Sequence, residues 1–401
     1  MTISDLQRRE NFYEINNKTL EKYFSEINRL SHRVKICGSN DAFSTNKSYF
    51  FIYPRINAIV TKDSSREVRE YIYKEFSNNP SLLKRFAIYF YTRLLLKSKG
   101  KFSDKCISIE PKIKDENSLL IFPGNKKIKI FNFQENYIDN IVKESFIDYS
   151  FNKELDFRLN NTKYDFVLGV ERYSNRWYRE KIIDGVSLPR ISNKNKHKLL
   201  KENVNKILDL LQENTKKEIE IGEYVNKLVC KIKKGSRELG NKSEKFNFER
   251  KLEKFVMFLV NMIANKKDII LLSLSHGDMQ EGNVIIRKAD EKIFIVDWET
   301  WSERTIWYDK LMFNYNLRNI YKFINNLKKY LFNHKDIICK DRNDIFTADL
   351  KRRRVIAIIF ILEDLLWQIE ESNNFPYDIV SNSVEKCFDR NFQKELIDLL
   401  V

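Results

Sequence analysis

The spacing of hydrophobic residues changes along the chain, and the change predicts a sheet-rich part followed by a helical part. Between residues 113 and 184, short apolar runs at 118–122 and 127–133 flank a Pro-Gly-Asn turn, which predicts a β-hairpin. Beyond residue 184, apolar residues recur every three or four positions, which is the spacing of one buried face of an α-helix. The pattern predicts an α+β protein whose strands precede most of its helices.

The helical part contains two clear apolar stripes. They consist of Leu200, Val204, Ile207, Leu208 and Leu211, and of Phe248, Leu252, Phe255, Val256, Leu259 and Ile263. Further helices are expected at residues 310–332, 353–372 and 383–400. We expect these stripes to form a core, because such spacing is more typical of packing than of a ligand pocket.

The first 112 residues contain no motif that carries chemistry. Helices are expected at residues 66–76 and 82–96, and no internal repeat is evident. We therefore expect three parts: an N-terminal extension of unknown role (1–112), a small sheet lobe (113–184) and a helical lobe (185–401).

Polar residues cluster around a second predicted hairpin, which is the most informative stretch of the chain. Two short apolar runs, 284–286 and 293–296, predict its strands. Asn283 precedes the first strand and Asp297 follows the second, so pairing of the strands brings the two residues side by side. Asp278 lies on the preceding loop, five positions before Asn283.

These three residue types suit the transfer of a phosphoryl group. An amide oxygen and a carboxylate are hard ligands for Mg²⁺, which keeps some of its waters and takes further ligands from substrate phosphates. A second carboxylate beside such a metal, here Asp278, can accept a proton from a hydroxyl group. Positioning and charge stabilisation supply most of the catalysis in this reaction class.

The wording of this stretch, H-G-D-x-x-x-G-N from His276 to Asn283 and then V-D-W-E around Asp297, resembles the aminoglycoside phosphotransferase and choline kinase family. The resemblance implies a protein-kinase-like fold with a small antiparallel-sheet lobe and a helical large lobe. It implies transfer of the γ-phosphoryl group of ATP or GTP to a hydroxyl of a small molecule, such as a sugar, an amino alcohol, an aminoglycoside or a glycolipid precursor. Asp278 would be the catalytic base, and Asn283 and Asp297 would hold Mg²⁺.

The same resemblance suggests where the nucleotide binds. Lys129 on the strand 127–133 would contact the phosphates, and Glu144 on a helix expected at residues 135–149 would hold that lysine. The backbone around Lys181 and Ile182 would bind adenine. The glycine-rich loop of protein kinases is missing, so a plain hairpin would cover the phosphates.

Two further residues of the motif region receive supporting roles. His276 is expected to brace the loop, a role favoured over that of a catalytic base. Asp309 would bind the backbone of the catalytic loop by resemblance, and a helix N-cap is an equally good interpretation.

Three alternatives remain open from the sequence. The polar residues of the motif could be ordinary turn residues. A protein kinase is disfavoured, because only eleven residues separate Asp297 from Asp309, which leaves little room for a peptide-docking loop. A catalytically silent nucleotide-binding scaffold is disfavoured because all three key polar residues are present.

The chain of 401 residues carries a formal charge of +16, spread without a dense basic block. A diffuse excess favours compositional bias over a nucleic-acid patch, so no nucleic-acid partner is expected. The positive charge argues against a polycationic acceptor, and contact with a membrane surface stays open. The oligomeric state does not follow from the charge. The longest apolar run, 355–362, is too short to span a bilayer.

The cysteines and histidines do not indicate a structural metal. Five cysteines are scattered singly, with no C-x-x-C pair, and only four histidines are present. We therefore expect neither a disulfide framework nor a zinc site, and we expect a reducing cytoplasm as the location. The N-terminal ten residues are polar and show no signal peptide.

Overall fold

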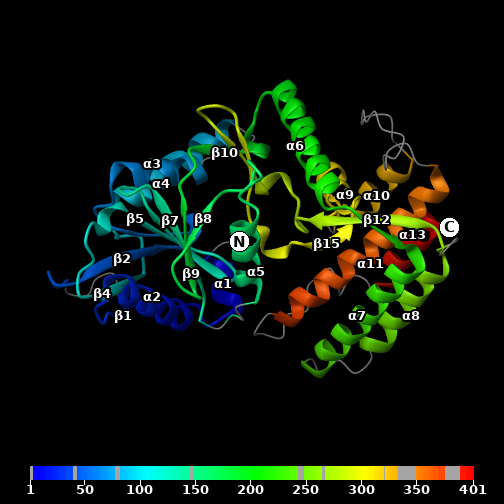
Figure 1. Ribbon diagram of the computed structural model, residues 1–401. Coiled ribbons are helices and arrows are strands. Elements are labelled where there is room, and N and C mark those ends of the chain that lie inside the picture. The colour runs from blue at the N-terminus through cyan, green and yellow to red at the C-terminus, as the bar shows by residue number, and fades with distance from the viewer. Residues whose placement is uncertain are drawn as a thin grey trace. The chain divides into compact units, whose positions relative to one another are not determined.

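The chain forms two compact units, residues 1–184 and 185–401 (Figure 1). The computed structural model describes residues 3–38, 43–76, 82–144, 146, 149–242, 248–263, 267–319, 321–332, 349–374 and 389–401. The predicted α+β class is confirmed, with the large antiparallel sheet in the first unit and most helical residues in the second. In the described part of the chain, no helix is long and apolar enough to cross a membrane.

The first unit is built on one nine-stranded sheet in the order β1-β4-β2-β3-β5-β6-β7-β9-β8. Its strands are β1 (Arg33–Gly38), β2 (Ser48–Tyr53), β3 (Ala58–Thr61), β4 (Lys105–Glu110), β5 (Leu119–Pro123), β6 (Lys127–Asn132), β7 (Tyr137–Val142), β8 (Val170–Arg172) and β9 (Trp177–Lys181). Every neighbouring pair is antiparallel, which fits the short apolar runs of the sequence.

Helices cover both faces of this sheet (Figure 1). On one face α1 (Ile3–Arg9) and α2 (Phe12–Asn28) share a core with the inward side chains of β6, β7 and β9. On the other face lie α3 (Arg66–Phe76), α4 (Leu82–Lys97) and α5 (Tyr149–Asn160). Because strand side chains alternate, neighbouring residues such as Lys127 and Ile128 serve opposite faces.

The boundary expected at residue 112 falls within this sheet, whereas the boundary at 184 coincides with the junction of the two units. Strand β3 of the expected extension pairs with β5 of the expected small lobe, with Ile59 opposite Ile121. The core under α1 and α2 also draws on both segments. Residues 1–112 therefore share one sheet and one core with the residues that follow them.

One helix prediction was wrong. Residues 135–149 were expected to be helical, yet 137–142 form the buried strand β7 and the helix α5 begins only at Tyr149. The apolar residues of this stretch are spaced like a helical face, but the strand is flanked on both sides by β6 and β9. Its buried polar residues, Asp139 and Asn140, broke the alternation that would have revealed a strand.

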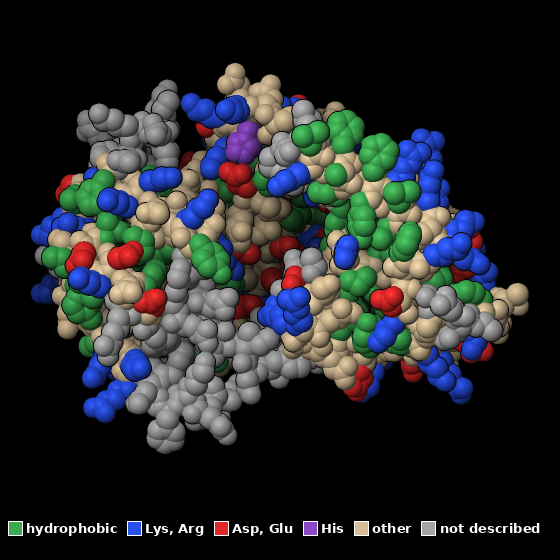
Figure 2. All heavy atoms as spheres, turned by 180° about the vertical axis from the view of Figure 1, so that it is seen from behind, with side chains coloured by type: hydrophobic (Ala, Val, Ile, Leu, Met, Phe, Trp, Pro, Cys, Tyr) green, Lys and Arg blue, Asp and Glu red, His purple; other side chains and the backbone are tan. Residues whose placement is uncertain are grey.

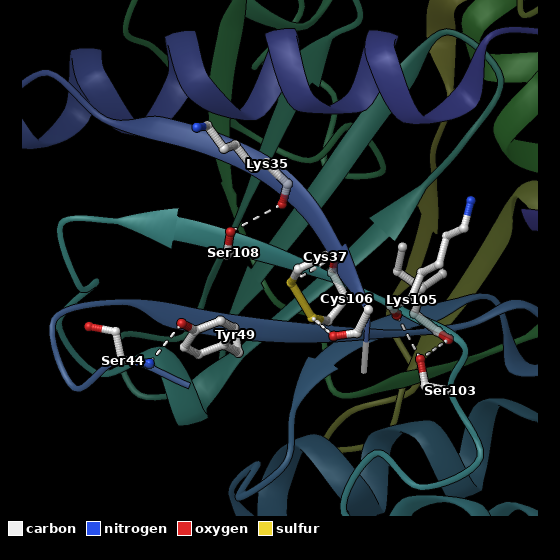
Figure 3. The surroundings of a disulfide bond; sticks show 10 residues. Lys35, Cys37, Ser44, Tyr49, Ser103, Lys105, Cys106 and Ser108 are labelled. Carbon is white, nitrogen blue, oxygen red and sulfur yellow. Dashed lines mark hydrogen bonds between the residues drawn. A yellow bond between two sulfur atoms is a disulfide. The ribbon is translucent and has the colours of Figure 1, made fainter. Parts of the chain in front are cut away.

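The cysteine prediction was also wrong in one respect, because Cys37 and Cys106 form a disulfide (Figure 3). The two residues lie directly opposite each other on the antiparallel strands β1 and β4, with 5.3 Å between their Cα atoms. Because 69 residues separate the two cysteines, their spacing in the sequence did not indicate that they pair. The cysteines therefore no longer support a reducing cytoplasm, and that location stays a prediction.

The second unit combines two small sheets with long helices. One sheet has the order β10-β13-β14 and the other β11-β12-β15. The strands are β10 (Gly185–Ser187), β11 (Lys217–Glu220), β12 (Ile269–Ser275), β13 (Val284–Arg287), β14 (Ile293–Ile295) and β15 (Ser302–Thr305). The helices are α6 (Lys194–Thr215), α7 (Ile221–Lys242), α8 (Phe248–Asn261), α9 (Tyr308–Tyr315), α10 (Phe323–Phe332), α11 (Leu350–Asn374) and α13 (Arg390–Leu400). The predicted hairpin and both predicted apolar stripes lie here, on β13–β14, α6 and α8.

Candidate active site

The loop that carries Asp278 connects β12 to β13, and a buried carboxylate holds its backbone. Asp309, in the first turn of α9, accepts hydrogen bonds from the backbone N–H groups of His276 at 2.6 Å and Gly277 at 3.0 Å. The N-cap of α9 is Trp307, so Asp309 serves the loop and not its own helix. Of the two roles expected for Asp309, the geometry supports the contact with the loop.

His276 braces the loop from inside. Its ring is fully buried and lies against Trp298, with 4.6 Å between the ring centres. Nδ1 accepts the backbone N–H of Asp278, which leaves Nε2 to donate to the carbonyl of Val296 at 2.9 Å. Both ring nitrogens are therefore occupied by backbone groups, and the geometry fits the bracing role rather than that of a base.

Gly277 allows the chain to turn between His276 and Asp278. Its φ of +83° is a conformation that side chains rarely tolerate. A Cβ atom there would lie 2.3 Å from the carbonyl oxygen of Thr300 and 2.4 Å from Nη1 of Arg304. The glycine is therefore required by both conformation and space.

The carboxylate of Asp278 is three-quarters buried and has two polar neighbours. Gln280 donates to its Oδ1 at 2.5 Å, and Nη1 of Arg318 lies 3.4 Å from the same oxygen. Both contacts involve Oδ1, so Oδ2 is the atom available to accept a proton from a hydroxyl group.

Asn283 and Asp297 lie at the open end of the hairpin, as the sequence predicted. The backbone N–H of Val296 bonds to the carbonyl of Asn283 at 3.0 Å, which sets Asp297 one residue beyond that contact. The side-chain nitrogen of Asn283 donates to the carbonyl of Asp278 at 2.8 Å, so its amide oxygen points the other way. Asp297 adopts a left-handed backbone conformation, with φ of +62°, which turns the chain away from β14.

This donor set fits Mg²⁺ with water and phosphate ligands. Among the described residues no cluster of three or more His, Cys, Asp or Glu could hold a metal by protein ligands alone. One amide oxygen and one carboxylate match the way Mg²⁺ is bound when substrate phosphates complete its shell. The residues therefore suit a nucleotide-bound Mg²⁺ better than a permanent protein metal centre.

Glu281 anchors the catalytic loop to α6. Its carboxylate accepts from Lys201 at 3.0 Å and lies 3.1 Å from Nε2 of His197. Partial burial raises the pKa of Glu281, but the hydrogen bond and charge of Lys201 and the proximity of His197 outweigh it and lower the pKa overall. Sequence analysis missed this anchor, because its partners lie some eighty residues earlier.

Arg318 is a second residue that the sequence did not reveal. Its guanidinium lies 3.5 Å from the ring centre of Trp367 on α11, besides its contact with Asp278. Nη1 is buried and makes no hydrogen bond to any group in the described part of the chain. Burial raises the pKa of the neighbouring Asp364 carboxyl, and the charge of Arg318 opposes that rise. The guanidinium of Arg318 therefore lies against the ring of Trp367 and close to the carboxylates of Asp278 and Asp364.

The nucleotide-binding residues predicted by resemblance lie in the first unit. Lys127 and Lys129 occupy one face of β6, and Lys127 forms a buried ion pair with Glu154 of α5. Arg158, one turn further along α5, bonds to Glu180 at 2.6 Å. Burial raises the pKa of Glu180, but the charges of Arg158 and Lys129 outweigh it, with the hydrogen bonds to Glu180, and lower the pKa overall. This face therefore holds a compact network of alternating charges.

Glu144 has different surroundings from those expected. It follows β7, not a helix, and its carboxylate forms ion pairs with Lys22 and Arg176. The helix carboxylate that meets a β6 lysine is Glu154. A prediction could find Glu154 only after placing the start of α5.

Lys181 and Ile182 lie at the end of β9, next to the junction of the two units. Lys181 pairs with Tyr137 in the sheet, and Ile182 donates its backbone N–H to the carbonyl of Asn136 at 3.2 Å. The adenine role stays a prediction.

Comparisons with known proteins add relatives by structure only. No protein-family model and no curated protein sequence matches the chain. An ethanolamine kinase from Plasmodium vivax is 16% identical, with 84% of this chain and 95% of that chain covered at a TM-score of 0.41. A choline kinase from Cryptosporidium parvum is 12% identical, with coverages of 71% and 92% at a TM-score of 0.43. An aminoglycoside phosphotransferase solved with ADP and hygromycin B is 12% identical, with coverages of 70% and 92% at a TM-score of 0.43.

By their names these structures are an ethanolamine kinase, a choline kinase and an aminoglycoside phosphotransferase. At this level of similarity, the case for function rests on the residues of the chain itself.

Proposed function

We propose that the protein is a phosphotransferase that moves the γ-phosphoryl group of ATP, or of GTP, to a hydroxyl group of a small molecule, with Mg²⁺ as cofactor. One observation carries the proposal. A loop held by Asp309, His276 and Asn283 carries Asp278, and Asn283 and Asp297 stand at the two ends of the hairpin that follows this loop. Such preorganisation is costly to build and is typical of a site that positions reactants.

Asp278 accepts the proton of the acceptor hydroxyl as that oxygen attacks the γ-phosphorus. Gln280 and Arg318 hold Oδ1, so the proton goes to Oδ2. Asn283 and Asp297 would hold Mg²⁺, which when bound offsets the negative charge of the nucleotide phosphates. The β–γ bridging oxygen keeps the electrons of the broken bond and leaves with the nucleoside diphosphate.

Lys127 is the cation that we assign to the nucleotide phosphates, with Glu154 as the residue that holds it. The pair is buried on both sides, and a lysine fixed by a helix carboxylate is the arrangement that kinases use. Lys129, predicted from the sequence for the same role, lies two residues away on the same face and is more exposed. Because the two lysines share one face of β6, substituting each in turn tests which of them binds the phosphates.

The acceptor is neutral or anionic where it meets the base. Arg318 already places a positive charge against Trp367 and within 3.4 Å of Asp278. A cationic group would have to displace this guanidinium or lie beside it, and both cost free energy. Hydroxyls of sugars, sugar acids and glycolipid precursors fit this surrounding better than a polycationic aminoglycoside.

The structure of the segment after Asp297 disfavours a protein kinase. Residues 298–300 form a short 3₁₀ helix, and β15 pairs with β12 immediately afterwards. The segment is therefore committed to the sheet below the catalytic loop, and little of it could dock a peptide.

A thermal-shift experiment tests the proposal. A ligand that binds only the folded state raises the melting temperature, by a free energy that grows with its concentration relative to Kd. Mg-ATP and Mg-GTP should each be tried on the wild type, on Asp297→Ala and on Asp290→Ala. Asp290 is the matched control, because it lies on the same hairpin and forms an ion pair with the exposed Arg287.

We expect a shift of several degrees in the wild type and in Asp290→Ala, and a much smaller shift in Asp297→Ala. Equal shifts in all three proteins would contradict the metal role of Asp297. No shift in any of them would contradict nucleotide binding and thus the proposed function.

A further inference from the structure

Helix α4 has two apolar faces, and within the part of the chain that the structure describes only one of them is covered. Its inner face carries Thr92, Leu95 and Leu96, which are buried in the core of the first unit. Its outer face carries Leu83, Phe86, Phe90 and Leu94, which are 83%, 60%, 56% and 66% exposed. These four positions follow the spacing of a helical stripe. The inner face already secures the helix, so folding of the unit does not explain the outer one.

The charges along α4 have one sign. The helix carries Lys84, Arg85, Arg93 and Lys97, and its sequence contains no Asp or Glu. A surface of hydrophobic side chains with Lys and Arg beside them is visible on the first unit in Figure 2. Phe102, in the turn that follows the helix, is a further hydrophobic side chain with 70% of its surface exposed.

We propose that the outer face of α4 docks on an anionic lipid bilayer. A helix that lies in the plane of the bilayer needs an apolar face for the acyl boundary and cations for the headgroups, and α4 supplies both. Lys and Arg side chains near an anionic surface strengthen binding to it, so the cations of α4 favour such a surface. The inference is independent of the proposed phosphotransferase activity.

The charge pattern argues against a second copy of the chain as the occupant. A two-fold dimer through α4 would bring the four cations of one helix against the same four of its partner. Burial of Leu and Phe side chains would then be opposed by repulsion between like charges. An anionic bilayer meets the apolar stripe and the cations together, without that penalty.

Co-sedimentation with lipid vesicles tests the proposal. The vesicles should be neutral phosphatidylcholine in one series and a mixture with anionic phosphatidylglycerol in the other. The variant Phe86→Ser/Phe90→Ser removes the apolar contact, and Arg93→Glu/Lys97→Glu reverses the charge. Leu199→Ser/Leu210→Ser on α6 is the matched control, because these leucines are similarly exposed, at 56% and 52%, on the other unit.

We expect the wild type and the α6 control to bind anionic vesicles, and to bind neutral vesicles at least tenfold more weakly. Both α4 variants should lose at least tenfold in affinity for anionic vesicles while keeping the melting temperature of the wild type. High salt should weaken the binding.

Three results would overturn the proposal. The first is that the wild type does not sediment with anionic vesicles at low salt, and the second is that the α4 variants bind as well as the α6 control. In the third, light scattering would show a wild-type dimer that Phe86→Ser/Phe90→Ser converts to a monomer, which would assign this face to a second copy. A variant that unfolds is replaced by the single substitution Phe90→Ser, so that vesicle binding is always measured on a folded α4 variant.

Discussion

The catalytic loop of the second unit and the charged face of β6 in the first unit are built in opposite ways. Asp278, Asn283 and Asp297 come from twenty consecutive residues, and backbone hydrogen bonds to near neighbours set their positions. Lys127 and Glu154 come from a strand and a helix, and they meet because a buried strand and a helix pack together. The first site depends on local geometry, whereas the second depends on the register of a sheet.

A second buried ion pair, Lys143 with Glu10, shows that the sheet register decides on which face a lysine lies. Lys143, just after β7, forms an ion pair with Glu10 on the face covered by α1 and α2, and both side chains are almost fully buried. The pair resembles Lys127 and Glu154 in chemistry and burial but lies on the opposite face of the sheet. Burial lowers the pKa of Lys143, and the charge of Glu10 opposes that shift. Chemistry alone therefore does not distinguish the two pairs, and only one of them shares a face with Lys129.

The largest effect is expected at the catalytic loop. Asp278→Asn keeps the shape and the hydrogen bond from Gln280 but removes the proton acceptor, so turnover should fall by about 10²–10⁴. Binding of Mg-ATP should remain close to wild type. Steady-state kinetics and ATP titration measure the two quantities, with Asp290→Asn as the control on the same hairpin. Undiminished turnover in Asp278→Asn would remove this residue from the mechanism.

The second effect separates the two buried pairs. Lys143→Met leaves the buried Glu10 carboxylate without this partner, which should lower stability by roughly 3–5 kcal/mol. Lys127→Met should cost less, because Nη1 of Arg158 lies 3.5 Å from the Glu154 carboxylate and still offsets its charge. Only Lys127→Met should also lower kcat/KM for ATP, by about 10²–10³, because it removes a phosphate-binding charge. Melting temperature and kinetics together make the comparison, with Lys129→Met as the third variant.

If a single variant is too unstable to assay, the paired changes Lys127→Met/Glu154→Gln and Lys143→Met/Glu10→Gln remove both charges. A kinetic loss in Lys129→Met alone would return the phosphate role to the residue predicted from sequence. Equal kinetic losses in the Lys127 and Lys143 variants would show that general stability, and not the shared face, decides activity.

The third effect concerns Arg318, which links the local loop to the distant helix α11. Arg318→Ala should free the face of the Trp367 ring for a small cation. The affinity for such a cation should rise by about tenfold or less. Tetramethylammonium serves as the probe, and tryptophan fluorescence and thermal shift serve as the readouts. Arg318→Lys should stay closed to the probe because it keeps the charge. Equal binding of the probe to wild type and Arg318→Ala would show that Arg318 does not set the charge preference.

The smallest effect is a dependence of stability on pH beneath the catalytic loop. Glu363 accepts hydrogen bonds from Tyr224 and from Thr305 on β15, and burial raises its pKa to about 7 despite these bonds. The folded protein therefore holds a proton that the unfolded chain has already released above pH 4.5. Stability from this group is fully present below that pH and is lost as the pH rises to about 7.

Glu363→Gln should remove this dependence, which amounts to about 3 kcal/mol when the rise in pKa from 4.5 to about 7 is converted to free energy. Denaturant unfolding at pH 5 and pH 8 measures it in the variant and the wild type. The glutamine can keep the bonds to Tyr224 and Thr305, so its stability should change less between the two pH values. An identical change in both proteins would show that other groups govern the response.

The hairpin and its three polar residues could be predicted because they come from one short stretch of the chain, although Asp309, which holds the loop, lies more than thirty residues beyond it. The runs 284–286 and 293–296 became β13 and β14, which pair directly with each other across a short turn. The role of His276 also followed, since its partners lie within the same stretch. Arg318 and Glu281 escaped prediction because their partners belong to other helices.

Strand β7 shows why the first unit was harder to predict. Asp139 is buried, and it is stable there because Arg179 donates two hydrogen bonds at 2.8 Å and Tyr23 donates a third. These partners lie 40 and 116 residues away in the chain. A sequence pattern that does not identify these partners predicts an exposed position for Asp139. It therefore predicts a helix where the structure has a strand.

By itself, the sequence of this protein determined the α+β class, the hairpin and the identity of three polar residues at its end, because turns and hairpins follow from interactions between neighbours. The tertiary structure decided which lysine meets a helix carboxylate, which cysteines pair, what lies against Asp278, and which face of α4 is left exposed. Those outcomes depend on the register and packing of distant segments, where burial makes a charge or a polar group tolerable only if its partner arrives from elsewhere in the chain.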